Sequence, residues 1–272
     1  MTGLGNKVAL VTGGASGIGK AIAARLAADG ARVVISDVQQ DTGRALAVQQ
    51  GYDFVVHDVV DEQQWIALMR HLQSACGGLH ILVNNAGVLS PPSERANPET
   101  STLSDWRRIF AVNTDGVFLG CKTAIPIIHA SGGGSIINMS SVAALLATPF
   151  AAAYGASKAA VRQLTKSVAQ HCAERRLNIR CNSVHPGIVR TVALDRAFAE
   201  AASQRGTALE TILGERQGAV PLGSFARLED IASAVSFLAS DDSRHMTGAQ
   251  LVIDGGLVDC DTYHNTGLTD RK

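Results

Sequence analysis

The sequence carries no excess of charge of either sign. Lysine and arginine together number 24, aspartate and glutamate also number 24, and the isoelectric point is about 7.1. Proteins that bind nucleic acid or acidic membranes concentrate positive charge on the binding surface, and a balanced sequence offers no such footprint. We therefore expect neither a nucleic-acid partner nor a membrane partner.

The sequence has few cysteines, and they follow no spacing that is typical of a disulfide framework or a metal site. The five cysteines include no Cys-x-x-Cys pair and stand far apart, at Cys76, Cys121, Cys172, Cys181 and Cys260. An odd and scattered set is typical of reduced thiols in a cytoplasmic protein, and it argues against a disulfide framework or a metal site. We expect a cytoplasmic protein without a bound metal.

Long apolar runs are also missing. No stretch of about 20 apolar residues occurs, which excludes a membrane-spanning helix, and the first residues lack the pattern of a secretory signal. There is no internal repeat, linker or low-complexity segment. The composition of the 272 residues, 46% hydrophobic and 18% charged, is that of a globular protein. We predict a single domain over residues 1–272.

Short β-branched runs alternate with helical patterns along the whole chain. Strands are predicted at Lys7–Thr12, Arg32–Ser36, Asp53–His57, His80–Val83, Ser135–Met139, Asn178–Val184 and Gln250–Asp254. The first run shows no polar alternation, as expected for a strand buried on both faces. The alternation predicts an α/β fold, a single doubly wound, Rossmann-like parallel sheet with helices on both faces.

Two helical patterns carry residues of interest. In Asp61–Ala75 one stripe, made of Trp65, Leu68, Met69 and Leu72, is expected in the core. A longer pattern runs from Leu103 to about Ala130, and its expected core residues are Trp106, Ile109, Phe110, Val117 and Phe118. Asn113 lies inside this pattern, where asparagine is mildly unfavourable, which indicates a specific hydrogen-bonding role.

A glycine-rich turn follows the first predicted strand. The segment Thr12–Gly19 reads TGGASGIG and leads directly into a helical pattern. The free N–H groups and the positive dipole end of a helix start can bind a phosphate. Gly13, Gly17 and Gly19 follow the spacing G-x-x-x-G-x-G, not the common G-x-G-x-x-G fingerprint. The alternative is a glycine-rich connection without a ligand.

An acidic residue ends the second predicted strand. Asp37 stands 24 residues after Gly13, where a carboxylate would accept hydrogen bonds from an adenosine ribose and repel a 2′-phosphate. Neither Gly14 nor Val38 supplies a cation that would offset the repulsion. The position predicts NAD in preference to NADP, unless Asp37 merely begins the following turn.

Polar residues end the neighbouring strands as well. Asp58 follows the third strand, where it is placed to reach an adenine amino group, and Asn84–Gly87 (NNAG) follows the fourth. The two amides can satisfy nearby backbone groups, or simply form an Asx turn. Ser141 follows the fifth strand. Because ligands of doubly wound sheets bind beyond the carboxyl ends of the strands, we expect one binding site at this edge.

The stretch from Ser140 to Lys158 combines a hydroxyl, a phenol and an amine. Tyr154 and Lys158 are four residues apart, so on a helix their side chains share one face. Lowering the tyrosine pKa from about 10 to about 7 takes roughly 4 kcal/mol, which one ammonium and a bound cofactor cation would supply together. We interpret this stretch as a catalytic centre, although an isolated Tyr-x-x-x-Lys pair also arises by chance.

The sixth predicted strand leads into a turn. Pro186 and Gly187 fix its geometry, so that the backbone of Ile188 and the hydroxyl of Thr191 can face a ligand. His185 precedes the turn. It is a possible proton carrier, but a histidine in such a place is more often satisfied structurally.

Two segments fall outside the regular alternation. Residues from about 189 to 218 are polar, Ala-rich and less regular, and we expect a mobile lid over the substrate there. The C-terminal tail, residues 257–272, contains no motif that predicts a role.

Taken together, the motifs resemble those of the short-chain dehydrogenase/reductase family. The resemblance covers Val8 to about Gly256 and rests on order and spacing. Its elements are TGGASGIG at 12–19, Asp37, Asp58 with Val59, NNAG at 84–87, Asn113, a serine 13 residues before the tyrosine, YGASK at 154–158 and PGIVRT at 186–191.

The resemblance implies a role for each motif residue. Tyr154 would be the general acid/base, and Lys158 would bind the nicotinamide ribose and lower the tyrosine pKa. Ser141 would hydrogen-bond the substrate oxygen, and Asn113 would hold a water in a proton relay. The residues placed at the cofactor are Gly13, Ser16, Gly17, Ile18, Gly19, Asp37, Val38, Asp58, Val59, Asn85, Ala86, Gly87, Tyr154, Lys158, Pro186, Gly187, Ile188 and Thr191.

The implied reaction is hydride transfer between C4 of the NAD nicotinamide and a secondary carbinol carbon, with Tyr154 taking the hydroxyl proton. Uncharged residues would line the approach, at Val88, Leu89, Ala144, Leu145, Leu146, Pro149, Phe150, Val189, Val192 and Leu194. They favour a small-molecule substrate of the apolar cyclic alcohol or hydroxysteroid type.

Two alternatives stay open. A reductase of 3-oxoacyl carrier-protein thioesters would share the fold and the catalytic set, although Asp37 argues against its usual NADPH. A non-catalytic NAD-binding protein would have no use for a proton relay. Family members commonly form dimers or tetramers, and the Ala-rich run Ala151–Ala169 would allow close helix contact. We therefore expect a symmetric homo-oligomer, a tetramer or a dimer.

Overall fold

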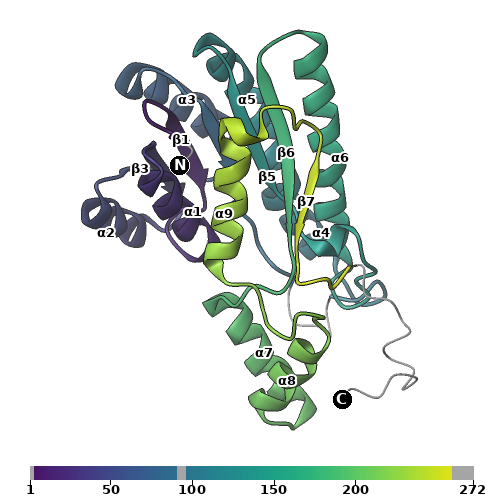
Figure 1. Ribbon diagram of the computed structural model, residues 1–272. Coiled ribbons are helices and arrows are strands. Elements are labelled where there is room, and N and C mark those ends of the chain that lie inside the picture. The colour runs from purple at the N-terminus through teal and green to yellow at the C-terminus, as the bar shows by residue number, and fades with distance from the viewer. Residues whose placement is uncertain (1–2, 91–95, 259–272) are drawn as a thin grey trace.

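A computed structural model describes residues 3–90 and 96–258 of the chain (Figure 1). Its strands form one parallel sheet in the order β3-β2-β1-β4-β5-β6-β7. They are β1 (Val8–Thr12), β2 (Arg32–Asp37), β3 (Asp53–Val56), β4 (Ile81–Asn84), β5 (Gly134–Met139), β6 (Ile179–Pro186) and β7 (Gln250–Ile253). The doubly wound parallel sheet predicted from the sequence is confirmed.

Helices cover both faces of this sheet. They are α1 (Gly17–Ala28), α2 (Gln40–Gln50), α3 (Glu62–Cys76), α4 (Leu103–Phe110), α5 (Gly116–Ala130), α6 (Ala152–Glu174), α7 (Val192–Arg205), α8 (Leu209–Gly218) and α9 (Leu228–Ala239). Helices α3, α5 and α6 pack on one face through residues such as Trp65, Ile128 and Val161. Helices α1 and α9 pack on the other through Ile22 and Val235. The central strands β1 and β4 are accordingly buried along their whole length.

The strand order reverses between β1 and β4, and this reversal places the site. The chain builds β1, β2 and β3 outward in one direction, then returns to add β4 on the free side of β1. The connections that leave β1 and β4 therefore diverge and open a crevice at the carboxyl edge. Helices α7 and α8 lie together beyond that same edge, as Figure 1 shows.

Local capping explains why α3 begins and ends where it does. The Asp61 side chain accepts hydrogen bonds from the backbone N–H groups of Gln63 and Gln64, and Gly77 ends the helix in a left-handed conformation with φ of 78°. Between these caps, the predicted stripe packs into the core, with Trp65 fully buried. The core assignment of this stripe is confirmed.

The helical pattern from Leu103 to Ala130 departs from the prediction. It forms α4 and α5 with a π-helical turn, Ala111–Asp115, between them. Ile109 and Val117 are buried as expected, but Trp106 is 37% exposed and Phe118 is 49% exposed. The assignment of Trp106 and Phe118 to the core was wrong. Both aromatic rings lie on the outer side of their helices.

Two further segments differ from the sequence prediction. Helix α2 was not predicted, because its sequence, QDTGRALAVQQ, buries only a few small and apolar residues. The segment expected to be an irregular lid is mostly regular, since it forms α7 and α8, which an Arg205–Glu215 ion pair joins. Most of the predicted tail, residues 259–272, lies outside the described residues.

The described cysteines are free thiols. Cys121, Cys172 and Cys181 are buried and Cys76 is partly exposed. In the part of the chain that the structure covers, no helix is long and apolar enough to cross a bilayer, and no group of three or more histidine, cysteine or acidic side chains is arranged to hold a metal ion.

His57 is a buried histidine just after β3. Its Nδ1 atom lies 3.2 Å from the Ser36 hydroxyl, and its ring meets the Trp65 ring edge to face at 4.4 Å. Its Nε2 atom has no hydrogen-bond partner among the described residues. Burial lowers the pKa of His57 to about 4 from 6.5, although Asp58 and Asp61 oppose the shift. The folded protein therefore holds this ring neutral.

This histidine predicts a loss of stability in acid. Between pH 6.5 and about 4 the unfolded chain binds the His57 proton and the folded chain does not. Stability therefore falls as the pH drops through that window, by on the order of 3 kcal/mol for this group. In urea unfolding at several pH values, His57→Asn should flatten the slope of stability against pH. His71→Asn, on the exposed face of α3, is the matched control. Equal slopes in all three proteins would contradict the assignment.

Candidate active site

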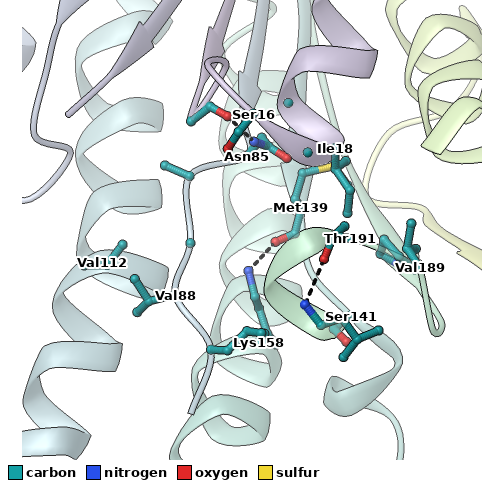
Figure 2. A pocket seen from close by; sticks show the side chains of 18 of the residues that line it. Ser16, Ile18, Asn85, Val88, Val112, Met139, Ser141, Lys158, Val189 and Thr191 are labelled. Carbon is teal, nitrogen blue, oxygen red and sulfur yellow. Dashed lines mark hydrogen bonds between the residues drawn. The ribbon is translucent and has the colours of Figure 1, made fainter. Parts of the chain in front are cut away.

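A cavity with a volume of about 860 Å³ opens at the carboxyl edge of the sheet. Residues that follow β1, β2, β3, β4, β5 and β6 all contribute to its walls, together with α6 and the start of α7. Figure 2 shows Ser16, Ile18 and Asn85 at one end of it and Lys158 and Ser141 toward the other. The single site predicted at this edge is therefore a continuous cavity.

The glycine-rich turn forms one end of the cavity. Gly13 and Gly17 have φ values of 62° and 53°, which L side chains rarely adopt. A Cβ atom on Gly19 would lie 2.2 Å from the carbonyl oxygen of Gly13, so only glycine fits there. The turn ends at the start of α1, whose unpaired N–H groups favour a phosphate at this position.

Two side chains tie this turn to the end of β4. The hydroxyl of Thr12 accepts hydrogen bonds from the N–H groups of Asn85 and Ala86 at 3.0 and 3.1 Å. In return, the Asn85 amide donates to the carbonyl oxygens of Thr12 and Gly13 at 2.9 and 3.2 Å. Of the two amides of the NNAG segment, Asn85 thus satisfies backbone groups, as the sequence predicted, whereas the Asn84 amide donates to the Asn138 side chain at 2.8 Å. These four hydrogen bonds hold the glycine-rich turn and the loop after β4 at a fixed distance from each other.

Asp37 lies in the same cavity at the end of β2. Its Oδ2 atom accepts a hydrogen bond from the N–H of Ala15 at 3.1 Å, and its Oδ1 atom accepts one from the N–H of Gln39 at 3.0 Å. The carboxylate is therefore held in one orientation. The Oδ1 atom also accepts a longer bond from the Gln39 amide at 3.4 Å, and the Oδ2 atom can still accept a further bond from a ligand hydroxyl.

Tyr154, Lys158 and Ser141 come together at the other end of the cavity. The Lys158 Nζ atom donates to the carbonyl oxygen of Met139 at 2.8 Å, as Figure 2 shows, and lies 5.8 Å from the centre of the Tyr154 ring. The Ser141 hydroxyl accepts a bond from the N–H of Ala143 at 3.1 Å. Its own proton is free to donate toward Tyr154, and this interaction lowers the pKa of Tyr154.

The two adjacent serines have separate tasks. The Ser140 hydroxyl donates its proton to the backbone carbonyl of Lys158 at 2.9 Å. This hydrogen bond holds α6 against the end of β5, so the Ser140 proton is not available to a ligand. The Ser141 hydroxyl is the one that faces the phenol. The sequence argument for Ser141 over Ser140 is consistent with this arrangement.

The pKa values in the protein without ligand differ from the simple expectation. Burial raises the pKa of Tyr154 above 10, and the hydrogen bond with Ser141 only partly opposes the rise. Burial also lowers the pKa of Lys158 from 10.5 to about 8. In the protein without ligand the phenol is therefore not acidified, because desolvation outweighs the lowering by Ser141.

Asn113 lies in the π-helical turn and is fully buried. Its Oδ1 atom accepts from the N–H of Val88 at 2.8 Å, and its amide donates to the Val88 carbonyl and the Ser157 hydroxyl at 3.0 and 3.2 Å. The hydrogen-bonding role expected of this residue is therefore visible. A Cβ atom on Gly87 would lie 3.3 Å from Asn113 Oδ1 and 3.5 Å from Lys158 Nζ, which places both polar atoms around Gly87.

All the residues predicted to bind the cofactor line the cavity. Asn113 is not among the lining residues, and neither are five of those expected along the substrate approach, at Ala144, Leu145, Leu146, Pro149 and Phe150. The η3 turn, Val142–Ala144, directs the chain away from the cavity after Val142. Phe150 is 66% exposed.

Sequence reasoning also missed several lining residues. Each of them is a close sequence neighbour of a predicted residue. Val112 precedes Asn113, and Met139 and Val142 flank the two serines. Gln39 lies two residues after Asp37, and His57 directly precedes Asp58. Their positions in strands and turns gave no signal of their own. In Figure 2, Val88 and Val112 lie on one side of Lys158, and Val189 lies on the other side of the cavity.

Comparison with known proteins gives a consistent set of matches. Residues 13–258 match a protein-family model described as Enoyl-(Acyl carrier protein) reductase. An NADP-dependent (R)-specific alcohol dehydrogenase from Lentilactobacillus kefiri is 40% identical over 258 residues, which cover 93% of this chain and 97% of that protein. A 3-beta-hydroxysteroid dehydrogenase from Comamonas testosteroni is 40% identical over 257 residues, covering 94% and 97%.

A solved structure agrees with these sequence matches. The ligand-free aldohexose dehydrogenase from Thermoplasma acidophilum superimposes with a TM-score of 0.85 and 34% sequence identity, over 99% of this chain and 98% of that one.

The glycine turn gives a direct test of ligand binding. Gly19→Ala would push a methyl group into the Gly13 carbonyl, 2.2 Å away, and distort the turn. We expect its affinity for a nicotinamide dinucleotide, measured by fluorescence titration, to fall by at least about tenfold. Gly214→Ala is the control, because a Cβ at that position in α8 meets nothing within 4 Å. Binding by Gly19→Ala as tight as that of the unmodified protein would show that the turn is not the ligand site.

Proposed function

Because the chain belongs to the short-chain dehydrogenase/reductase family, we propose that it is an NAD-dependent dehydrogenase of apolar cyclic secondary alcohols, including hydroxysteroids. Membership of this family makes the chain an oxidoreductase that acts on secondary alcohols with a nicotinamide dinucleotide. The preference for NAD, the kind of alcohol and the roles of individual residues are proposals that rest on the cavity of this chain.

One observation carries the proposal. A phenol, an amine and a hydroxyl gather at one end of an otherwise largely apolar cavity, and a glycine turn with a helix N-terminus closes the other end. The first group supplies proton transfer, and the second supplies an anchor for a pyrophosphate. A dinucleotide stretched between the two ends would place its reactive ring beside the phenol.

The residues divide the chemistry between them. Ser141 donates a hydrogen bond to the oxygen at the reacting carbon and keeps it close to Tyr154. In alcohol oxidation, Tyr154 as phenolate takes the hydroxyl proton, and the carbinol hydrogen leaves with its two electrons as hydride. When bound, the oxidised nicotinamide supplies the hydride acceptor and a positive charge that favours the phenolate. Lys158 adds a second positive charge, and Asn113 is the proposed anchor of a water that returns the proton to solvent.

Asp37 is the basis for proposing NAD. Its carboxylate is fixed by Ala15 and Gln39 at the end of the cavity where an adenosine ribose would lie. Among the described lining residues, Lys158 is the only lysine or arginine, so no guanidinium or ammonium stands ready for a 2′-phosphate. The Lentilactobacillus kefiri relative is named as NADP-dependent, which makes Asp37 the residue to test.

The remaining walls favour an apolar alcohol. The side chains nearest the reacting end are aliphatic, at Val88, Leu89, Val112, Val142, Val189, Val192 and Leu194. Such walls gain free energy from burying hydrocarbon and offer no partner to several sugar hydroxyls. The name of the Comamonas testosteroni relative agrees with this interpretation, whereas the structural neighbour is named for an aldohexose.

A carrier-protein thioester reductase is the second candidate, because the matching family model is described as an Enoyl-(Acyl carrier protein) reductase. That function would require NADPH in its usual form, which the carboxylate of Asp37 opposes. The homo-oligomeric state and the cytoplasmic location expected from the sequence also stay predictions. Four free thiols among the described residues are in keeping with a reducing compartment.

A substrate panel tests the proposed activity. We expect NAD-linked oxidation of cyclic secondary alcohols and hydroxysteroids, followed by absorbance of NADH, to exceed that of aldohexoses and to accompany little reduction of acyl thioesters. Tyr154→Phe should lose about 10²- to 10⁴-fold in kcat, because the proton acceptor is gone, while NAD affinity stays near that of the unmodified protein. Turnover preserved in Tyr154→Phe, or a clear preference for aldohexoses or thioesters, would contradict the proposal.

Exchange of Asp37 tests the cofactor choice. The unmodified protein should show a higher kcat/KM with NAD than with NADP. Asp37→Ser removes the repulsion of the 2′-phosphate and should raise kcat/KM for NADP by at least about tenfold. Asp242→Ser, an exposed acid on the turn Asp241–Ser243, is the charge-matched control and should change neither value. A preference of the unmodified protein for NADP would overturn the assignment to NAD.

A further inference from the structure

His185 is fully buried at the end of β6, directly behind Ser141. Both nitrogens of its ring have partners. The Nδ1 atom lies 3.1 Å from the backbone carbonyl oxygen of Ser141, and the Nε2 atom lies 2.9 Å from the Ser183 hydroxyl. The ring does not line the cavity. It therefore contacts the catalytic serine without reaching a substrate.

The partners determine which nitrogen carries the proton. A carbonyl oxygen can only accept, so the bond to Ser141 requires a proton on Nδ1. In the neutral ring Nε2 is then the acceptor, and the Ser183 hydroxyl donates to it at 2.9 Å, in preference to the Ala249 carbonyl oxygen, which lies farther away at 3.3 Å. The histidine is a fixed donor to the Ser141 carbonyl.

The surroundings keep this ring neutral. Burial lowers the pKa of His185, the positive charges of Arg162 and Lys158 lower it further, and only the bond to Ser141 opposes them. Arg162 itself is held by Gln250 of β7 at 2.5 Å. A second proton on the ring would add a charge next to two existing cations, so the donor pattern toward Ser141 is stable.

The Ser141 peptide is constrained from two directions. Its carbonyl oxygen accepts from His185 and also from the N–H of Ala144 at 3.0 Å, so both of its lone pairs are used. Its hydroxyl oxygen accepts from the N–H of Ala143. With these three bonds made, the hydroxyl proton is left to point at the Tyr154 oxygen.

We propose that His185 is a positioning residue, whose Nδ1–H bond to the Ser141 carbonyl aims the Ser141 hydroxyl at Tyr154. The inference deepens the proposed dehydrogenase function and rests on it. His185 acts through Ser141 and takes no part in proton transfer itself.

Two substitutions of His185 by amide side chains test its two hydrogen bonds, to Ser141 and to Ser183, independently of each other. The amide nitrogen of asparagine is as many bonds from the backbone as Nδ1, and that of glutamine as many as Nε2. His185→Asn therefore keeps a donor for Ser141, whereas His185→Gln keeps only a partner for Ser183. We expect kcat of the Asn variant to stay within about threefold of the unmodified protein, and kcat of the Gln variant to fall by about tenfold or more. The KM for NAD should change little in either.

Ser183→Ala is the matched control for the second bond. It removes the partner of Nε2 and leaves the bond to Ser141 in place, so its kcat should resemble that of His185→Asn. A purely structural role of His185 would lower the melting temperature of all three variants without separating their kcat values.

A spectroscopic readout tests the same point without turnover. The chain has three tyrosines, so subtracting the ultraviolet titration of Tyr154→Phe isolates the ionisation of Tyr154. Loss of the Ser141 bond should make the ionisation constant of Tyr154 about tenfold smaller in His185→Gln than in His185→Asn. If no alcohol is oxidised at all, the proposed function fails, but this titration still decides the positioning role.

The outcomes are separable. The inference is overturned if His185→Gln keeps the kcat and the Tyr154 titration of the unmodified protein, or if His185→Asn loses as much as His185→Gln. Should His185→Gln not fold, nitrogen NMR of the unmodified protein decides, with the His185 signals identified by their absence in His185→Asn. A proton on Nδ1 and none on Nε2 supports the inference, and the reverse tautomer overturns it.

Discussion

The site depends on one constraint, the placement of a partly buried phenol and a buried amine on the same face of α6 beside the end of β5. Burial works against both charged forms, because it raises the pKa of Tyr154 and lowers that of Lys158 to about 8. The protein alone therefore holds Tyr154 neutral. A positive charge that arrives with the oxidised cofactor would shift this balance in favour of the phenolate, so ionisation of the base is coupled to cofactor binding in our account.

The fold supplies the precision that this coupling needs. Met139, Ser140 and Ser141 leave β5 in succession, and each has a bond that fixes it to α6 or β6, through Lys158 and His185. At the other end of the cavity, the paired bonds between Thr12 and Asn85 hold the glycine turn. Both arrangements belong to strand ends at one edge of the sheet, so the distance between anchor and base is set by the sheet itself.

The sequence predicted the features that depend on local pattern. Strand alternation identified the sheet, and the spacing of Tyr154 and Lys158 identified their common helix face. What it missed depends on tertiary contacts. Nothing local shows that Trp106 and Phe118 face outward, that Asn113 sits in a π-helical turn, or that the chain leaves the cavity after Val142. The desolvation that raises the pKa of Tyr154 likewise arises from the tertiary structure around the cavity, and spacing alone pointed in the opposite direction.

The ionisation of Tyr154 with and without NAD tests the central claim most directly. The difference between the ultraviolet titrations of the unmodified protein and Tyr154→Phe reports this one phenol. Our account predicts a pKa above that of free tyrosine in the protein alone, and a clearly lower pKa when NAD is saturating. A Tyr154 pKa that does not respond to NAD would contradict it.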